Sequence, residues 1–435
     1  MEEDLAKTKI TETLVEKRVK TRLTSAIQRA ETKLNYEMAH DGELLLALEI
    51  VHEFLKKKRR VCYGGTAMNA ILPVEKRFYQ TDYDLPDYDF FTPEIEDDIE
   101  DLVHMLKEAG FKDVFHKMGI HEGTKKILVN FTPIADITYI SSSIYKVFYK
   151  RSIVREGVHY TDPEILRMMM YLELSRPKGM VSRWGKVYER LQLINEEFPV
   201  KRSVGFTRRE KGKGGAAKGA AKGAATPLPA ELRDQVFSFC IENQRSVIIG
   251  DLDTFYTRAI GNTKSPEFNI ETYRGIIGWL TPNLKEDAKK LQSLLGGAPT
   301  CRIFLHPAKS EIVSEYVEVT YKGVPAALLI QENACHSYLS FPVRDGRSIS
   351  IASLDTLITL YYSIAIFTMK ARHYIPKIES RIAKFVTLAE KNRVAKNPKI
   401  PAFPIICHGY QKGFSTLLKE KLGRVEEEKK LLKGL

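Results

Sequence analysis

The sequence predicts an α+β protein with more than one domain, and three observations favour this class. The 435 residues are 43% hydrophobic and 10% aromatic, which is enough apolar surface for several packed cores. Apolar residues recur at helical spacing in some segments and form short strand-like runs in others. A stretch rich in Gly, Ala and Lys, residues 206–229, has no large side chain to pack and therefore predicts a linker between two domains.

Residues 1–58 are expected to be helical. Apolar residues follow helical spacing in DGELLLALEIVHEFLKKK, and Asp41 is well placed to cap the start of that helix. The run Arg60–Tyr63 predicts a short strand. The pair Gly64 and Gly65 then predicts a turn into another helix, which begins in TAMNAIL.

The rest of the predicted domain 59–205 alternates between strands and helices. DYDFF predicts a strand, EIEDDIEDLVHMLKEAG an amphipathic helix that ends at Gly110, and KKILVNF and IADITYI two more strands. In the last predicted domain, 230–435, strands are expected at CRIFLH, YVEVTY and AALLIQ. RSVIIGDLDTFY has the outline of RRVCYGGTAMN, with Asp251 at the place of Gly65, so this domain is predicted to duplicate the fold of the first.

The formal net charge of +12, from 67 Lys and Arg against 55 Asp and Glu, favours a polyanionic partner. The densest positive stretch is 201–222, which is either an inert tether or an electrostatic arm for a phosphate backbone. The longest apolar run, Leu354–Met369, contains Asp355 and is shorter than the ~20 apolar residues of a membrane span. We therefore expect a buried core helix there.

The first residues, MEEDLAKTKI, are charged and lack the apolar stretch of a secretory signal, so we expect no export and an intracellular location. Five cysteines lie far apart, without the paired spacing of a disulfide framework or a zinc knuckle, and are expected to be free thiols. These are Cys62, Cys240, Cys301, Cys335 and Cys407.

Three acidic residues carry the predicted chemistry. Asp87 and Asp89 would project from one face of the strand in DYDFF, and Asp136 lies among apolar neighbours in IADITYI. Several buried carboxylates repel one another, so their grouping makes physical sense if Mg²⁺ or Mn²⁺ neutralises them. Such an arrangement suits a two-metal attack on a phosphoryl group. An earlier pair, Asp82 and Asp84, is less suitable because the Leu-Pro step after it breaks the strand.

A phosphate-binding turn is predicted beside these acids. A strand that ends in Gly64 and Gly65 and opens a helix at Thr66 lets backbone N–H groups approach phosphate oxygens. The glycine pair by itself is more typical of an ordinary tight turn. Arg167 and Lys186 belong to a run of cations after the third acid and are expected to bind triphosphate or RNA phosphates. The alternative for each is a solvated charge or a local ion pair.

The order of these motifs resembles the nucleotidyltransferase superfamily of polymerase β-like enzymes. GGTAMNAILP followed by LPDYDFFTP is similar to the poly(A) polymerase catalytic subunits of poxviruses and other large cytoplasmic DNA viruses. The block LRMMMYLELSRPKGMVSRWGKVYERLQLIN, residues 166–195, resembles a second signature of that family. Gly65 and Asp87 are 87 − 65 = 22 residues apart, which is longer than the compact motif of the superfamily.

The resemblance implies a polymerase β-like nucleotidyltransferase domain. The second domain has lost the glycine pair and has no acid pair on a strand in the required order, so we predict that it is degenerate, binds RNA or another subunit and does no chemistry. The resemblance assigns catalysis and metal binding to Asp87, Asp89 and Asp136, and the triphosphate to Gly64–Thr66. The implied reaction is template-independent transfer of AMP from ATP to RNA 3′ ends, with Mg²⁺ or Mn²⁺ as cofactor. The implied location is the host cytoplasm or the virion of a large DNA virus. A homodimer or a processivity partner is left open.

Two alternatives to poly(A) synthesis stay open at this point. The same fold and acids would serve another terminal nucleotidyltransferase, of the uridylyl or oligoadenylate type, because a few hydrogen bonds from any loop select the base. A catalytically silent RNA-binding scaffold is the other alternative, although it has no need of three acids that are costly to bury. Trp184 and Tyr188 are candidates for stacking on a base, but core packing is the more common role of such residues.

Overall fold

The computed structural model describes residues 2–80, 82–85, 87–200, 228–243, 245–261, 268, 273, 276–309, 312–343, 347–367, 369–375 and 377–433. Most of the predicted linker, residues 206–227, lies outside these ranges. The described chain forms two compact units. The first consists of Met1–Tyr139 with Ile153–Tyr160, and the second of Ile140–Ser152 with Thr161–Leu435.

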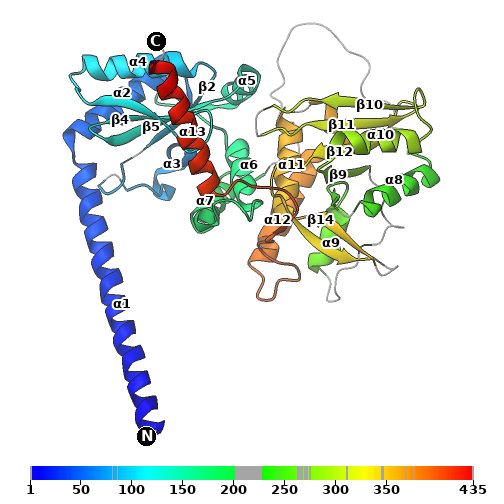
Figure 1. The fold of residues 1–435 in the computed structure, drawn as a ribbon, viewed down its shortest axis with the longest axis horizontal. Coiled ribbons are helices and arrows are strands. Elements are labelled where there is room, and N and C mark those ends of the chain that lie inside the picture. The colour runs from blue at the N-terminus through cyan, green and yellow to red at the C-terminus, as the bar shows by residue number, and fades with distance from the viewer. Residues whose placement is uncertain are drawn as a thin grey trace. The chain divides into compact units, whose positions relative to one another are not determined.

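The first unit is built around a mixed sheet (Figure 1). Its helices are α1 (Glu2–Ala39), α2 (Gly42–Lys58), α3 (Gly64–Ile71) and α4 (Ile95–Glu108), with a 3₁₀ turn at Val74–Lys76. Its strands are β1 (Val61–Tyr63), β2 (Tyr88–Thr92), β3 (Val114–Met118), β4 (Thr124–Val129), β5 (Thr132–Tyr139), β6 (Ile153–Arg155) and β7 (Val158–Tyr160). Among the described residues, seven strands form this sheet in the order β3-β4-β5-β2-β1-β7-β6. β1 and β2 are antiparallel, whereas β2 with β5 and β1 with β7 are parallel, so the sheet is mixed.

Helices α2 and α4 pack on one face of this sheet (Figure 1). α2 begins at the predicted cap, where Asp41 Oδ1 accepts hydrogen bonds from the N–H groups of Glu43 (2.9 Å) and Leu44 (3.1 Å). The Phe54 ring of α2 lies 5.8 Å from the Phe90 ring of β2, measured between centroids. Because helices cover this face, the central strands place apolar side chains on it and polar side chains on the opposite face.

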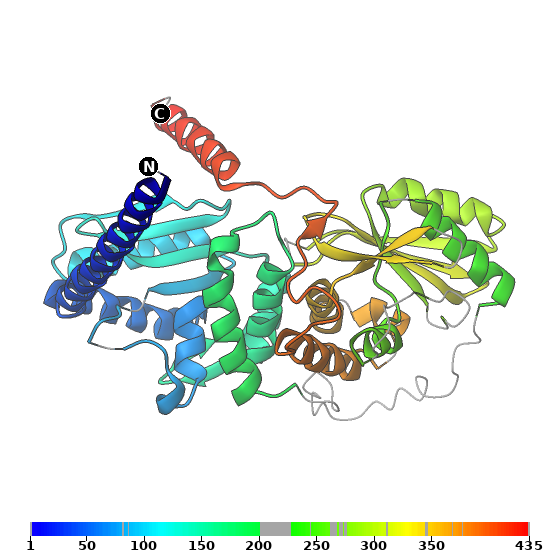
Figure 2. The ribbon, with the colours of Figure 1, turned by 90° about the horizontal axis from the view of Figure 1, so that it is seen from below.

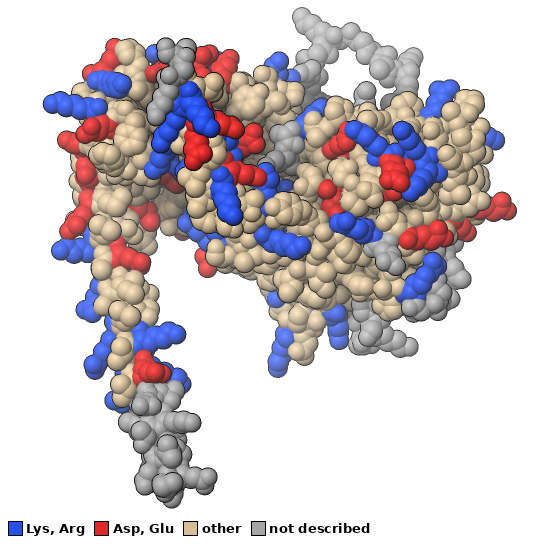
Figure 3. All heavy atoms as spheres, in the orientation of Figure 1, with Lys and Arg blue, Asp and Glu red and all other residues tan. Residues whose placement is uncertain are grey.

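Helix α1 is the most exposed element of the first unit. Its side chains from Val15 to Met38 are all exposed, and Lys and Arg side chains project from it (Figure 3). The prediction that residues 1–58 are mainly helical is confirmed by α1 and α2.

The second unit contains a larger sheet with helices on both faces (Figures 1 and 2). Its helices are α5 (Ser142–Arg151), α6 (Pro163–Leu174), α7 (Trp184–Glu197), α8 (Ala230–Glu242), α9 (Asp253–Gly261), α10 (Leu284–Leu294), α11 (Leu354–Phe367), α12 (Ile378–Arg393) and α13 (Phe414–Lys433), with 3₁₀ turns at Val181–Arg183 and Met369–Tyr374. Its strands are β8 (Val247–Ile248), β9 (Ile277–Thr281), β10 (Cys301–His306), β11 (Tyr316–Tyr321), β12 (Val324–Gln331), β13 (Ser337–Pro342), β14 (Ser348–Ala352) and β15 (Ile406–Cys407). Among the described residues, the sheet has eight strands in the order β10-β11-β12-β9-β8-β14-β13-β15.

The long apolar run of the sequence forms α11. Each of its residues from Leu354 to Phe367 is buried, which confirms the predicted core helix. Within the described ranges, no helix combines the length and apolarity needed to cross a membrane. Helices α5, α6 and α7 belong to the second unit, although the sequence places them in the domain 59–205. The compact units do not follow sequence order, so the predicted domains 59–205 and 230–435 stay a prediction.

The two sheets share one strand order. The order β3-β4-β5-β2-β1-β7-β6 corresponds to β10-β11-β12-β9-β8-β14-β13, and each corresponding pair runs in the same relative direction. The second sheet adds β15 beside β13. This correspondence confirms the duplicated α+β fold predicted from the shared outline of RRVCYGGTAMN and RSVIIGDLDTFY.

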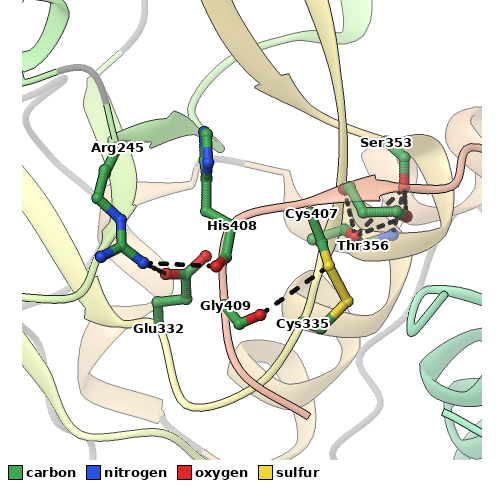
Figure 4. Close-up of a disulfide and its surroundings, with 9 residues drawn as sticks. Arg245, Glu332, Cys335, Ser353, Thr356, Cys407, His408 and Gly409 are labelled. Carbon is green, nitrogen blue, oxygen red and sulfur yellow. Dashed lines mark hydrogen bonds and ion pairs between the residues drawn. A yellow bond between two sulfur atoms is a disulfide. The ribbon is translucent and has the colours of Figure 1, made fainter. Parts of the chain in front are cut away.

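Cys335 and Cys407 form a disulfide, with 5.3 Å between their Cα atoms (Figure 4). The prediction of free thiols is therefore wrong for these two cysteines and confirmed for the other three. The two residues are 72 positions apart in the sequence, and the antiparallel pairing of β13 with β15, which sets Ser337 opposite Cys407, brings them together. Spacing in the sequence carries no sign of such a pairing.

Loss of this disulfide is expected to destabilise the second unit. The disulfide closes a loop across 72 positions, and without it the unfolded chain has more conformational entropy. The free energy of unfolding is therefore expected to fall by about 2–4 kcal/mol. Urea unfolding of the Cys335→Ser, Cys407→Ser double variant measures it. Reductant is the matched control, because it should destabilise the wild type and leave the double variant unchanged. Equal stability of the oxidised and reduced wild type would contradict the expectation.

Candidate active site

The turn between β1 and α3 is the first feature of the site. Gly64 has a φ of +72°, a left-handed conformation that glycine adopts without strain. A Cβ atom at this position would collide with the carboxylate of Asp89. Glycine is therefore required at residue 64 both for the backbone turn and for the close approach of Asp89.

Asp89 and Asp136 lie side by side on neighbouring strands. β2 and β5 run parallel with Asp89 opposite Asp136, so both carboxylates project from the same face of the sheet. Tyr63, at the end of β1, lies opposite Asp89 on its other side. Asp87 lies immediately before β2 and is exposed. The sheet thus brings Asp89 and Asp136 together beside the turn at Gly64.

Lys126 is a site residue that the sequence analysis missed. It lies opposite Asp136 in the antiparallel pair of β4 and β5, and its Nζ donates to Asp136 Oδ1 at 2.7 Å and also contacts Oδ2. The side chains of Lys126 and Asp136 are 33% and 24% exposed. The signal in the sequence is the second lysine of KKILVNF, but the register of the hairpin is needed to match it to the acid of IADITYI.

Hydroxyl groups continue the polar row beyond the acids. Tyr63 Oη lies 2.9 Å from Thr138 Oγ1, which lies 3.1 Å from Thr124 Oγ1. The Tyr63 ring stacks on that of Phe91, with 3.9 Å between centroids. Burial, together with the charge of Asp89, raises the pKa of Tyr63 above its ordinary value. The Tyr63 hydroxyl therefore stays protonated beside the acids at neutral pH.

The long segment between the glycine turn and the acid pair is held by two side chains. Thr66 Oγ1 donates to the backbone oxygen of Asp87 at 2.6 Å. Asn69 Oδ1 accepts from the N–H groups of Phe78 (2.9 Å) and Tyr79 (3.1 Å). Thr66 thus helps to position the start of β2, and with it the predicted acid pair. Asn69 was not singled out in the sequence, where a lone Asn in a helix carries no distinctive signal.

The earlier acid pair has a different setting. Asp84 Oδ2 accepts from the N–H group of Gln80 at 2.8 Å, which is a local turn contact, and Asp82 is exposed. Neither residue lies in a strand. Asp89 lies in β2 and Asp87 immediately before it, and the choice of Asp87 and Asp89 over the earlier pair stays a prediction.

The donor chemistry of this face fits a divalent cation. Carboxylate oxygens, which Asp89 and Asp136 supply, are the ligands that Mg²⁺ and Mn²⁺ prefer. Of the side chains that the structure describes, no three His, Cys, Asp or Glu residues are grouped so that they could hold a metal ion. The carboxylate of Asp136 is engaged by Lys126 instead.

Arg167 and Lys186 belong to the second unit. Arg167 is fully buried, pairs with Glu164 at 2.7 Å, and donates to Asn195 Oδ1 (2.7 Å) and to the Tyr362 hydroxyl (3.2 Å). Burial opposes its charge, yet Tyr362 and Glu164 together keep the pKa of Arg167 above the ordinary value. A guanidinium bonded in this way has a packing role, so the structure does not support the expected contact of Arg167 with a nucleotide.

Helix α7 carries the remaining candidates from the sequence. Lys186 is exposed on it. The rings of Trp184 and Tyr188 lie 6.3 and 5.4 Å from that of Phe403, and Arg393 lies 5.2 Å from the Tyr188 centroid. The two aromatic residues thus pack within the second unit, which is the more common role that the sequence analysis gave them.

In the described part of the second unit, the positions that correspond to Asp89 and Asp136 hold other residues. Thr92 and Thr281 hold the same place at the ends of β2 and β9, because each hydroxyl accepts the N–H group two residues later, at 2.9 and 3.1 Å. Three residues earlier stand Asp89 in β2 (92 − 89 = 3) and Gly278 in β9 (281 − 278 = 3). The residue opposite Gly278 on the next parallel strand is Leu328, at the place of the third acid.

The strand-to-helix turn of the second unit is filled by protein groups. A Cβ atom at Gly250 would collide with the hydroxyl of Tyr273. That hydroxyl accepts from the N–H group of Asp251 at 2.7 Å and donates to the backbone oxygen of Ile276 at 3.1 Å. Arg381 of α12 donates to Asp251 Oδ2 at 2.9 Å. These contacts support the prediction that the second domain is degenerate.

Sequence comparison finds that the part of the chain with the candidate site is similar to a known family. Residues 49–180 match the model of the poly(A) polymerase catalytic subunit. A protein of Acanthamoeba polyphaga mimivirus that is named for this subunit is 32% identical over 187 residues, which are 42% of this chain and 32% of that protein. A protein of African swine fever virus with the same name is 29% identical over 168 residues, 37% of this chain and 35% of that protein. The chain thus spans about a third of the length of the curated relatives it matches.

A solved structure has a similar fold. The crystal structure of the Megavirus polyadenylate synthase aligns with a TM-score of 0.71 and 20% identity, and it covers 95% of this chain and 83% of that one. At this identity the likeness shows the fold. The family resemblance noted in the sequence is thereby confirmed for residues 49–180, and the α+β fold for nearly the whole chain.

Proposed function

We propose that this chain, whose residues 49–180 match the poly(A) polymerase catalytic subunit family, transfers AMP from ATP to the 3′ end of RNA without a template and releases pyrophosphate. The observation that carries the proposal is the pair Asp89 and Asp136 on one sheet face, beside the turn at Gly64. The names of the viral relatives support it.

Asp87, Asp89 and Asp136 are the proposed ligands for Mg²⁺ or Mn²⁺ in a two-metal arrangement. When bound, such ions activate the attacking hydroxyl and stabilise the charge on the triphosphate and its leaving group. The parallel pairing of β2 with β5 fixes the spacing of Asp89 and Asp136, and the hydrogen bond from Thr66 fixes the backbone at Asp87. Carboxylates held together repel each other, and this repulsion favours cation binding.

The start of α3 is the proposed contact for the triphosphate. Gly65 and Thr66 lie in the first turn of α3, and an α-helix leaves its first N–H groups without intrahelical partners. The partial positive charge at that end of the helix favours phosphate oxygens. Lys186 is exposed and is retained as a proposed phosphate contact, whereas Arg167 is assigned to packing.

RNA is the proposed acceptor. The net charge of +12 supports a polyanionic partner, and the basic segment 201–222, which lies outside the described residues, is the proposed arm for the RNA backbone. The degenerate second domain is proposed to bind RNA or another subunit, with a homodimer as one form of the latter. The relatives are viral proteins, and we propose the host cytoplasm or the virion as the location on that ground.

The test is the incorporation of each of the four nucleoside triphosphates, in separate reactions, into a short labelled RNA with Mg²⁺ or Mn²⁺. We expect a ladder of added residues with ATP and at least about tenfold less product with UTP, GTP or CTP, because a base-reading site leaves polar groups unpaired with the wrong base. Chelation of the cation should stop the reaction.

The alternatives give different products in the same assay. Preference for UTP would identify a uridylyltransferase, and primer-independent products from ATP alone would identify an oligoadenylate-type synthase. Binding of the labelled RNA without incorporation of any nucleotide would identify a silent scaffold. Each of these three results would contradict the proposal.

A further inference from the structure

The ion pair between Lys126 and Asp136 involves one of the three proposed metal ligands. Lys126 Nζ donates to Asp136 Oδ1 at 2.7 Å and contacts Oδ2 as well, so the ammonium group faces both oxygens of the carboxylate. Backbone register produces this contact, because the two residues lie directly opposite each other on β4 and β5. A divalent cation competes for the same oxygens, and the ammonium group repels a metal ion at close range, so the ion pair opposes metal binding at Asp136.

In the protein without metal, the ion pair between Lys126 and Asp136 offsets the repulsion between Asp136 and Asp89. Asp89 and Asp136 lie opposite each other on β2 and β5, where two carboxylates repel each other. The ammonium of Lys126 places a positive charge directly beside Asp136. Since the Lys126 side chain is 33% exposed, its flexible stem can turn toward solvent without leaving a buried charge.

We propose that Lys126 is a positioning residue that holds Asp136 while the site is free of metal and is released when Asp136 binds a divalent cation. The strength of the Lys126–Asp136 pair then sets the affinity of the site for the cation. This inference rests on the proposed function, because it takes Asp136 as a metal ligand.

The second unit offers an internal comparison. Glu318 of β11 lies opposite Leu328 of β12, in the same register as Lys126 opposite Asp136. Where the acid is replaced by leucine, the lysine is replaced as well, and Glu318 pairs with His306 at 3.0 Å. The positive charge thus accompanies the carboxylate and is absent from the corresponding position of the degenerate site.

The first measurement is the affinity for Mn²⁺, by titration calorimetry or by electron paramagnetic resonance of free Mn²⁺, in the full chain without nucleotide. Lys126→Met should bind Mn²⁺ about fivefold more tightly than the wild type, as expected from the loss of one partly exposed ion pair. Lys126→Arg, which can pair with Asp136 again, should restore weaker binding.

Lys117 provides the matched control. It lies opposite Lys126 on β3 and is exposed, so Lys117→Met removes a charge from the same sheet face without releasing Asp136. A general electrostatic effect would give Lys117→Met the same gain in Mn²⁺ affinity as Lys126→Met. The inference requires a clearly larger gain for Lys126→Met.

The second measurement is the melting temperature without metal. Lys126→Met should lower it, because Asp136 then loses the ammonium group that pairs with it beside Asp89, and saturating Mn²⁺ should raise it by more than in the wild type. In an Asp136→Asn background, Lys126→Met should leave the melting temperature without metal unchanged. A purely structural lysine would destabilise both backgrounds equally.

Two failures can be told apart. If Asp89→Asn weakens Mn²⁺ binding but Lys126→Met binds it like the wild type, the inference about Lys126 is overturned and the proposed function stands. If neither Asp89→Asn nor Asp136→Asn weakens Mn²⁺ binding, the result contradicts the metal site of the proposed function and also the inference about Lys126.

Discussion

Asp89→Asn is expected to slow AMP transfer by about a thousandfold or more while RNA binding is unchanged, because the amide keeps the size of the side chain and loses the charge that holds the cation. Asp89 lies between Tyr63 and Asp136 on one sheet face and beside the turn at Gly64, so its role cannot pass to a neighbouring acid without a change of register. The rate of AMP addition to a labelled RNA, measured at saturating ATP, gives the effect on transfer.

Asp97→Asn is the matched control for this prediction. Asp97 is an exposed carboxylate in the first turn of α4, which packs on the opposite face of the same sheet. Its replacement removes one charge and should leave the rate of transfer unchanged. Melting curves of both variants exclude loss of folding as the cause. Activity of Asp89→Asn close to that of the wild type would refute the assignment of the acids.

Local patterns in the sequence were sufficient for the elements that carry the site. The glycine pair predicted the turn at Gly64, and the alternating pattern placed Asp89 in a strand. The expectation that Asp87 shares a face with Asp89 stays a prediction, because Asp87 lies immediately before β2. The third acid was found by its apolar neighbours on β5. That Asp136 lies opposite Asp89 was beyond such patterns, because β3 and β4 intervene in the sequence and the register of β2 with β5 is a property of the sheet.

Two contacts that the sequence did not predict depend on the register of paired strands. Lys126 meets Asp136 across a hairpin, and Cys335 meets Cys407 across 72 positions through β13 and β15. Neither partner is unusual in its own segment of the sequence. An alternating pattern predicts which face a residue takes, but it does not predict which residue of another strand lies opposite.

The role of Arg167 could not be predicted from the charge of its segment alone. Arg167 stands in LRMMMYLEL, a mainly apolar segment, and its position in a cation-rich block suggested a phosphate contact. In the structure, α6 is covered by α11, and Tyr362 of α11 together with Glu164 meets the guanidinium. Glu164 is 3 residues from Arg167 in the sequence, so helical spacing could predict this pair. Tyr362 is 195 residues away, and no pattern in the sequence links it to Arg167.

Arg167→Met is expected to lower the free energy of unfolding of the second unit by about 3–5 kcal/mol, because methionine fills the space but leaves Glu164 and Asn195 without their buried partner. Urea unfolding followed by circular dichroism measures the loss. Lys186→Met is the matched control from the same cation-rich block. Lys186 is exposed, so its replacement should leave stability unchanged and, if Lys186 binds phosphate, should raise the KM for ATP or RNA. If Arg167→Met were as stable as the wild type but had a raised KM for ATP, the packing role would be contradicted and Arg167 would be a nucleotide contact.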